Sequence, residues 1–226
     1  MRPSPDSTVA RRVPLPPARG FTLAEAVVAL AVAAILVGLA APSFRNLVAE
    51  QRRDAALGAL AGDLRFARSE AIKRAARIGV CARAAAGASG CGTDWSRGWV
   101  VWDDGGPTPG TIEPAEGETE LRVRGPVAEG LALDNRARTA SGMQAPTAFH
   151  AIRFGPRGTS SWRGGGTFWL CAPGGDVGGD AGGGTAAAVN VSLSGDVRRA
   201  REDGSGAPID AFGTPVSCAP DEAAAS

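Results

Sequence analysis

The chain has 226 residues, 44% of them hydrophobic, which is enough for one globular domain and an additional apolar segment. Its formal net charge is +1, with four arginines and one aspartate in the first twenty residues and 20 basic and 22 acidic residues in the remainder. This balance excludes a uniformly basic nucleic-acid-binding protein, although a local basic patch is compatible with it. Most of the 32 glycines and 16 prolines lie after residue 84, which favours a loop-rich β domain.

An uncharged apolar segment, residues 26–41, ends at Pro42. Counted from Phe21, the apolar stretch has 21 residues, and a helix needs about 20 to cross a bilayer. The alternative is a cleaved secretory signal peptide with its cleavage site at residues 39–41. However, the stretch is longer than the roughly 7–15 residues usual in such signals, and it contains Glu25, an acid that they normally lack. We therefore predict a retained transmembrane helix in which Glu25 has a partner, because a charge in lipid is costly.

The boundary between the basic leader and this helix carries a specific motif, RGFTLAE at residues 19–25. It resembles the type III signal of type IV pilins and type II secretion pseudopilins. The resemblance implies that a prepilin peptidase cleaves after Gly20, that Phe21 becomes an N-methylated N-terminus and that Glu25 is retained. It also implies a single-pass protein of the bacterial inner membrane whose C-terminal domain lies in the periplasm. The carboxylate of Glu25 in a neighbouring subunit can neutralise the new α-amine, which favours staggered packing of the helices.

After Pro42, which we expect to kink or interrupt the helix, apolar residues recur at spacings near three and four. This period predicts an amphipathic helix over residues 43–77 whose apolar stripe packs on a sheet. The members of the stripe are Phe44, Leu47, Val48, Leu57, Leu60, Leu64, Ala67, Ala71 and Ile72. The charged residues fall largely on the other faces and are expected to be solvated; they are Arg45, Arg52, Arg53, Asp54, Asp63, Arg65, Glu70 and Lys73.

From about residue 78 the pattern changes to short β-like runs between glycine-rich turns. The predicted strands lie at 78–82, 98–102, 120–124, 131–133, 148–154, 167–171 and 189–193. Strands that follow one long helix indicate an α+β fold, in which a long hydrophobic helix continues into an amphipathic helix packed on an antiparallel sheet. The expected organisation is a cleaved leader at 1–20, a transmembrane and assembly helix at 21–42, the amphipathic helix at 43–77 and a β-rich domain at 78–226.

Four sequence blocks narrow the resemblance. They are ARSEAIKR at residues 67–74, WSRGWVVWD at 95–103, IRFGPRG at 152–158 and GTFWLC at 166–171. Together they resemble the GspH/FimT-type pseudopilins. This resemblance implies a minor, low-copy subunit of an inner-membrane-rooted filament, either a type II secretion pseudopilus or a type IV pilus, acting in filament initiation or at the tip. Its partners would be the other pilins of the filament, prepilin peptidase and the inner membrane.

Four cysteines, all after the apolar segment, suit two disulfides in an oxidising compartment. They allow three pairings, and we favour the two local ones, Cys81 with Cys91 and Cys171 with Cys218. A metal site is the rival, but the sequence has no Cys-x-x-Cys and its single histidine, His150, lies in a β-like run. Hydrolase motifs such as Gly-x-Ser-x-Gly are also missing. We therefore predict no catalytic residue, metal or cofactor, and a protein that is not an enzyme.

Two further segments have both a functional and a structural interpretation. Clustered carboxylates at residues 103–106 are able to coordinate Ca²⁺, but aspartate and glycine also favour a turn, which we expect here. The glycine-rich run at 174–184 has neither the lysine nor the following helix start of a phosphate-binding loop. We expect it to be a surface loop.

The segment SGDVRRAR at residues 194–201 is the candidate for binding DNA. DNA-uptake members of the resembled family contact DNA through a Gly-Arg-x-Arg motif near the C-terminus. Gly195 and Arg198 match this motif, but Asp196 replaces its first arginine and repels phosphate. Arg199 and Arg201 are able to compensate in part, because phosphate contacts need positive charge more than fixed spacing. The alternatives for this segment are thus a DNA contact in natural transformation and a solvated hairpin edge whose charges discourage aggregation.

Overall fold

The computed structural model describes residues 22–85, 90–108, 110–139, 142–144, 151–172, 186–216 and 218. The chain divides into two compact units, Met1–Ser43 and Phe44–Ser226. Several predictions fall outside the described residues: the cleavage site at Gly20 and Phe21, the role of His150 and the glycine-rich loop at 174–184.

A single long helix, α1 (Leu23–Arg74), begins the described chain and passes through Pro42. Of the two outcomes predicted for Pro42, an interruption of the helix is therefore wrong, and a kink stays a prediction. A proline removes one backbone hydrogen bond and crowds the preceding turn, but the alanines and leucine before it are strong helix formers. Glu25 in the first turn and Lys73 and Arg74 in the last turn carry the charges that the helix dipole favours.

The first part of α1 carries exposed apolar side chains. Val27, Leu30 and Ile35 are each more than half exposed in the single chain. Nowhere in the described part of the chain is a helix both long enough and apolar enough to cross a membrane. Exposed apolar side chains that lie close together mark an interaction surface.

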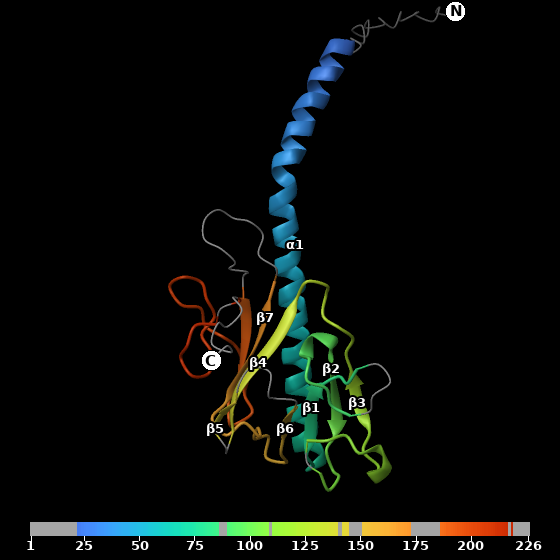
Figure 1. Ribbon diagram of the computed structural model, residues 1–226, viewed down its shortest axis with the longest axis vertical. Helices are drawn as coiled ribbons and strands as arrows, with labels where there is room; N and C mark the ends of the chain where they lie inside the picture. Colours follow the sequence, from blue (N-terminus) through green and yellow to red (C-terminus); the bar gives the residue numbers. More distant parts are fainter. Residues whose placement is uncertain are drawn as a thin grey trace, which may run out of the picture. The chain divides into compact units, whose positions relative to one another are not determined.

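Two antiparallel sheets and the remainder of α1 make up the second unit (Figure 1). One sheet has the strand order β3-β2-β1-β6 and the other β5-β4-β7-β8-β9. The strands are β1 (Ile78–Ala82), β2 (Trp99–Asp103), β3 (Glu120–Val123), β4 (Ala132–Thr139), β5 (Gly142–Gln144), β6 (Ala151–Phe154), β7 (Gly166–Cys171), β8 (Ala186–Val191) and β9 (Val197–Arg199). Short helices η1 (Trp95–Arg97) and η2 (Pro114–Glu116) precede β2 and β3. The predicted α+β fold is confirmed.

Most predicted strands are present with bounds shifted by a few residues, and 78–82 matches β1 at both ends. The prediction for 131–133 is too short, because β4 continues to Thr139. Along β4 the buried side chains of Leu133, Asn135 and Ala137 alternate with more exposed ones, so a period of two is present but polar residues conceal it. The three-residue strands β5 and β9, at the two edges of the five-stranded sheet, are absent from the prediction.

One hydrophobic core joins α1 to both sheets. Its contribution from α1 has the predicted spacing of three and four: Leu57, Leu60, Leu64, Ala67 and Ala71. The ends of the predicted stripe do not reach the core, since Phe44 is 66% exposed, Leu47 49% and Ile72 51%. The prediction that the charged residues are solvated is wrong for Arg53, Asp63 and Glu70, which are buried.

After β9 the chain forms two consecutive hairpins with the same seven-residue pattern, DGSGAPI at 203–209 and DAFGTPV at 210–216. In each unit the aspartate Oδ1 accepts hydrogen bonds from the backbone N–H groups two and four residues later, at 2.8–3.0 Å. The glycine at the fourth position has a positive φ in both units, which the tight turn requires. Isolated bridges then pair Glu202 with Pro208 and Ile209 with Pro215, so the two units repeat one structure.

The structure contains both disulfides that the sequence analysis favoured. Cys81 in β1 is bonded to Cys91, and Cys171 at the end of β7 is bonded to Cys218, after the second hairpin unit. The first bond closes the segment between β1 and η1, whereas the second ties the C-terminal segment to a central strand of the larger sheet.

Candidate functional site

The start of α1 contains the proposed assembly residue Glu25. Thr22, directly before the helix, accepts a hydrogen bond at its Oγ1 from the Glu25 N–H at 3.3 Å. In return, Glu25 Oε2 accepts hydrogen bonds from the N–H and the hydroxyl of Thr22, each at 3.4 Å. This reciprocal arrangement is a capping box, which satisfies the free N–H groups at a helix start. The carboxylate is exposed and lies beside the backbone N–H of Thr22.

The β8–β9 turn, residues 192–196, presents the candidate DNA-binding arginines. Its backbone is fixed by hydrogen bonds from Gly195 N–H to the Ser192 carbonyl at 2.9 Å and from Asp196 N–H to Ser192 Oγ at 3.1 Å. Gly195 has a φ of +75°, and a Cβ there would overlap the carbonyl oxygen of Gly158. The glycine that the sequence analysis matched to a DNA-binding motif therefore has a structural requirement of its own.

The three arginines of this segment have different surroundings. Arg198 is 81% exposed at its side chain and forms an ion pair with Asp196. Arg199 pairs with Asp54 of α1 at 3.2 Å. Arg201 is exposed, and its guanidinium has no hydrogen bond or ion pair to another described residue. The acid that interrupts the sequence motif thus directly neutralises the arginine that matches it.

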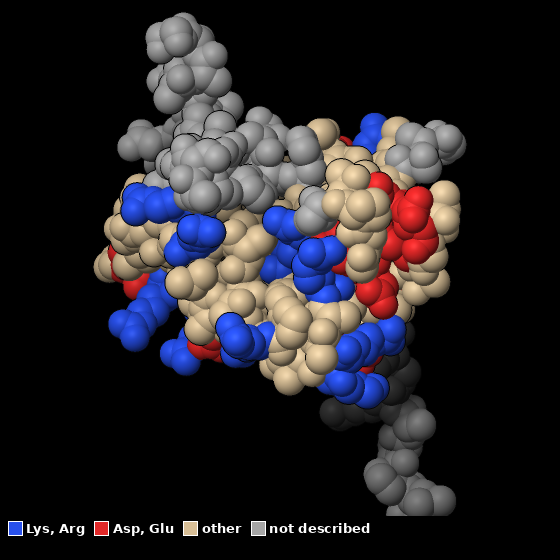
Figure 2. All heavy atoms as spheres, turned by 90° about the horizontal axis from the view of Figure 1, so that it is seen from below, with Lys and Arg blue, Asp and Glu red and all other residues tan. Residues whose placement is uncertain are grey.

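Charge is unevenly distributed over the surface of the second unit. Figure 2 shows acidic side chains gathered on one side of the face seen from below, and basic side chains scattered over the rest of it. The acids of the described loops are concentrated between β2 and β3, in residues 103–120, which contain six acidic side chains and no basic one. We call this segment the acidic connection.

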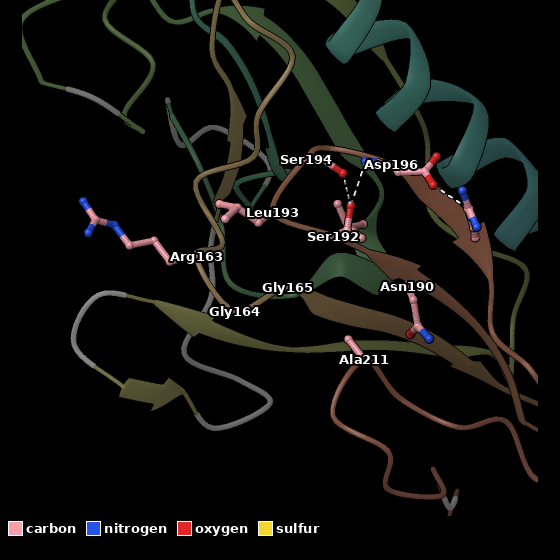
Figure 3. Close-up of a pocket in the computed structure, with 11 residues that line it drawn as sticks. Arg163, Gly164, Gly165, Asn190, Ser192, Leu193, Ser194, Asp196 and Ala211 are labelled. Atoms are coloured by element: carbon pink, nitrogen blue, oxygen red, sulfur yellow. Dashed lines mark hydrogen bonds and ion pairs between the residues drawn. The ribbon is translucent and has the colours of Figure 1, made fainter.

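A hollow of about 540 Å³ lies between the β8–β9 turn, the turn at residues 163–165 and the second hairpin unit (Figure 3). Ala211 and the backbone of Gly164 and Gly165 line one side of it, and Arg163 extends outward at its rim. The other lining residues are Asn190, Val191, Ser192, Leu193, Ser194, Asp196 and Arg198. The hollow therefore combines two guanidinium groups, one carboxylate, two hydroxyls and the half-exposed side chain of Leu193.

Asn190 and the serine hydroxyls of the hollow are already held by neighbours. Asn190 Nδ2 donates to the Ile209 carbonyl at 3.0 Å, and its Oδ1 accepts from the Thr167 hydroxyl at 2.7 Å. The hydroxyls of Ser192 and Ser194 are 2.8 Å apart. Arg163, by contrast, has no hydrogen bond or ion pair to another residue in the described segments. The fixed walls and the free guanidinium make the rim a preformed contact for an anionic group.

A buried network that the sequence analysis missed joins α1 to β2 and β3. Asp63 accepts hydrogen bonds from Trp99 Nε1 at 3.0 Å, from Arg122 Nη1 at 2.9 Å and from Arg124 Nε at 2.7 Å. Burial alone would raise the pKa of Asp63, but these donors together hold it below its usual value. The sequence does contain a signal for this network, because Asp63 is a charged residue between Leu60 and Leu64 of the apolar stripe.

Asp103 is the last residue of β2, and residues 104–106 follow it without the hydrogen-bonded turn that the sequence analysis predicts. Asp104 is fully buried and its Oδ1 accepts a hydrogen bond from Gly110 N–H at 2.8 Å. Burial raises the pKa of Asp104 above its usual value, and hydrogen bonding to Gly110 only partly offsets this. Glu118 accepts hydrogen bonds from Gly106 N–H and Glu113 N–H, both at 2.7 Å. Among the described residues, no group of three or more His, Cys, Asp or Glu side chains could hold a metal ion.

Comparison with protein families gives two matches. Residues 56–195 match the family described as type II transport protein GspH. Residues 16–41 match the prokaryotic N-terminal methylation motif. No curated protein matches the chain significantly.

Among solved structures, the chain is similar to the type IV minor pilin FimU of Pseudomonas aeruginosa. The two share 21% identity over 75% of this chain and 96% of that one, with a TM-score of 0.48. It is also similar to the minor pseudopilin EpsH from the type II secretion system of Vibrio cholerae. There the identity is 12% over 66% of this chain and 93% of that one, with a TM-score of 0.40.

Proposed function

The chain belongs to the GspH family of type II transport proteins, and on that premise we propose that it helps to initiate or cap a filament rooted in the bacterial inner membrane. It is a minor pseudopilin or pilin, of a type II secretion or type IV pilus system, and a structural subunit rather than an enzyme. The N-terminal methylation motif, which ends one residue before Pro42, is the observation that supports assembly into such a filament.

The motif implies cleavage and methylation of the chain directly before α1. Cleavage after Gly20 would leave Phe21 with a positively charged α-amine, and N-methylation keeps that charge. Thr22 directly precedes α1 and Glu25 lies in its first turn, with the Glu25 carboxylate exposed. We propose that the α-amine of Phe21 in one subunit pairs with Glu25 of a neighbouring subunit, so that two charges costly in an apolar environment neutralise each other.

The exposed apolar side chains of α1 support the same assembly. Val27, Leu30 and Ile35 have no cover in the single chain, and helices of neighbouring subunits would bury them. Prepilin peptidase and the other pilins of the filament are then the partners of this segment. The two disulfides agree with a domain in the periplasm, where disulfides form and persist.

Mass spectrometry of the N-terminus of the mature protein tests the processing step. We expect the mature chain to begin at N-methylated Phe21. A mature chain that begins at Pro42 would show a cleaved secretory signal instead and would contradict the proposal. Separately, deletion of the gene, scored for release of secreted proteins and for twitching, assigns the filament to secretion or to a pilus.

A substitution at Glu25 tests the assembly step. We expect Glu25→Ala to be processed normally but to disappear from the sheared filament fraction. Glu50→Ala provides a matched control, because Glu50 is also an exposed acid on α1 but lies outside the methylation motif. Equal loss of both variants from filaments would contradict the pairing of Glu25 with a terminal amine.

DNA binding through Arg198, Arg199 and Arg201 is the weaker candidate. Two of these arginines already pair with the carboxylates of Asp196 and Asp54. Arg201 alone remains as an exposed cation of this segment without a partner among the described residues. Phosphate binding depends on the number of uncompensated positive charges, so this arrangement supports at most a small electrostatic contribution.

A further inference from the structure

We propose that the acidic connection of one copy of this chain docks into the hollow beside the β8–β9 turn of a second copy. This contact would join folded domains, so it goes beyond the pairing of Glu25 and Phe21 and does not depend on it. The argument rests on the shape of the two surfaces, on how firmly each is held and on their opposite charge.

The acidic connection is a fixed and exposed projection. Every residue of η2 (Pro114–Glu116) is exposed, and Gly117 ends it in a left-handed conformation. Glu118 fixes the loop, because its buried carboxylate accepts hydrogen bonds from the backbone N–H groups of Gly106 and Glu113. Its shape therefore does not depend on a partner.

Two acids of this projection have carboxylates without a partner in the described part of the chain. Asp103 has an ion pair with Arg74 at 3.7 Å, and Asp104 and Glu118 are buried. Glu116 and Glu120, in contrast, are exposed, and their carboxylates have no hydrogen bond or ion pair to other residues that the structure describes. These carboxylates are available to an outside cation, and Glu116 lies at the exposed end of η2.

The hollow carries the opposite charge. Arg163 at its rim is exposed and has no partner in the described chain, and Arg198 is 81% exposed. Asp196 is the single acid in the lining, so the lining side chains have a positive balance. Leu193, which is 50% exposed, adds an apolar contact for the proline and alanine at the start of η2.

The opposite charges of the two surfaces indicate which partner docks. The acidic connection holds six acidic side chains and no basic one, and no described side chain pairs with the carboxylates of Glu116 or Glu120. A second copy supplies a positive rim and a fixed hollow for it, and complementary charges guide both the encounter and its orientation. Charges of the same sign would meet if two hollows or two acidic connections were opposed, which disfavours those arrangements.

Cysteine cross-linking of the full chain in its membrane tests the contact. One tagged copy carries Ala115→Cys on η2, and a copy with a different tag carries Ser194→Cys at the hollow. The four native cysteines are paired, so they do not compete. Under mild oxidation we expect a cross-linked product that carries both tags. In the control, Glu129→Cys replaces Ala115→Cys, since Glu129 is exposed but lies in the connection after β3.

Charge reversal distinguishes this docking from random collision. We expect Glu116→Arg in the first copy, or Arg163→Glu in the second, to lower the cross-linked fraction several-fold. Combining the two should restore at least half of it, because the pair is then complementary again with its signs exchanged. Glu50→Arg, at an exposed acid of α1, should have no effect.

Three results would overturn the proposal. They are a cross-link no stronger than the Glu129→Cys control, a cross-link that ignores both reversals, and reversals whose combination restores nothing. A fourth result would overturn the proposal in favour of a different ligand. If no cross-link forms and Arg163→Glu lowers the binding of a short DNA duplex, then the hollow binds nucleic acid rather than a second copy. Normal processing at Gly20 in all these variants keeps the outcome separate from that of the proposed function.

Discussion

The indole Nε1 of Trp99 donates a hydrogen bond of 3.0 Å to the carboxylate of Asp63 and so links the first residue of β2 to the C-terminal part of α1. Arg122 and Arg124, on and just after β3, complete the set of donors. Arg122 also lies over the ring of Phe66, with its guanidinium carbon 3.5 Å from the ring centroid. One buried carboxylate thus holds the helix against the edge of the four-stranded sheet.

Removing the charge of Asp63 should lower the stability of the domain. We expect Asp63→Asn to reduce the free energy of unfolding by about 1–3 kcal/mol, because hydrogen bonds to charged groups are lost and the indole N–H keeps a poorer partner. Arg122 and Arg124 are partly exposed, so water can solvate them in the variant and limits the loss. Urea unfolding measures the effect, with Glu50→Gln on the exposed part of α1 as the control. An unchanged midpoint would contradict the role of this network.

The same carboxylate should make the domain sensitive to acid. Because the folded pKa of Asp63 lies below its usual value of 3.8, its contribution is complete above that pH and is lost as the pH falls through the folded pKa. Asp104 has the opposite sign, since its raised pKa favours the protonated form in the folded state. We expect Asp63→Asn to flatten the decline in stability below pH 4. An identical acid limit in both proteins would assign the decline to other groups.

The two disulfides should contribute unequally. In the chain-entropy model the bond Cys81–Cys91, with a sequence separation of 10, is worth about 2.7 kcal/mol, and Cys171–Cys218, with a separation of 47, about 4 kcal/mol. We expect Cys171→Ala/Cys218→Ala to lower the denaturation midpoint more than Cys81→Ala/Cys91→Ala. The reverse order would show that native packing around β1 outweighs loop closure.

Gly195 should not tolerate a side chain. A Cβ at this position would overlap the Gly158 carbonyl, and its φ of +75° is unfavourable for other residues. We expect Gly195→Ala to cost about 1–3 kcal/mol through backbone strain and displacement of both turns. Gly204→Ala is the matched control, because nothing lies within 4 Å of a Cβ there. Thermal unfolding of the two variants provides the comparison, and equal midpoints would refute the requirement.

The ion pair between Asp196 and Arg198 predicts how any DNA binding should respond to mutation. We expect Asp196→Asn to bind a DNA duplex about two- to fivefold more tightly than the wild type at low salt, because an exposed ion pair worth up to about 1 kcal/mol no longer competes for Arg198. Glu202→Gln removes the same charge nearby without touching Arg198. Gel shifts that improve equally for both variants would point to net charge alone, and no shift in any of them would exclude DNA as a ligand.

Sequence patterns were sufficient where one side chain period dominated. The run of buried residues in β1 and the helical stripe at Leu57, Leu60 and Leu64 followed directly from hydrophobicity, and the local cysteine pairs followed from their spacing. The methylation motif at residues 16–41 was recognisable because it combines a basic leader, a glycine and an acid at fixed positions. These features depend on local sequence, so no knowledge of distant contacts was needed.

The remaining features depend on contacts between residues far apart in the chain. Asp63 is buried only because Trp99, Arg122 and Arg124 reach it from β2 and the end of β3, and a helical pattern places it among solvated charges. Asn135 and Arg136 lie in a strand because they pair with Phe168 and Thr167 of β7, not because either residue favours one. The hollow is made by three turns whose proximity no sequence spacing reveals.

The two hairpin units at residues 203–216 determine where the C-terminal cysteine meets the sheet. Each unit reverses the chain through an antiparallel bridge, Glu202 with Pro208 and then Ile209 with Pro215, and Cys218 lies two residues after the second unit. Removal of residues 203–209 should leave one intact hairpin but bring Cys218 out of reach of Cys171. We expect two free thiols per chain in that variant by thiol titration, against none in the wild type. The repeated units would then act as a spacer between β9 and Cys218. An insertion or deletion in this region would be compatible with the disulfide only if it kept Cys218 within reach of Cys171.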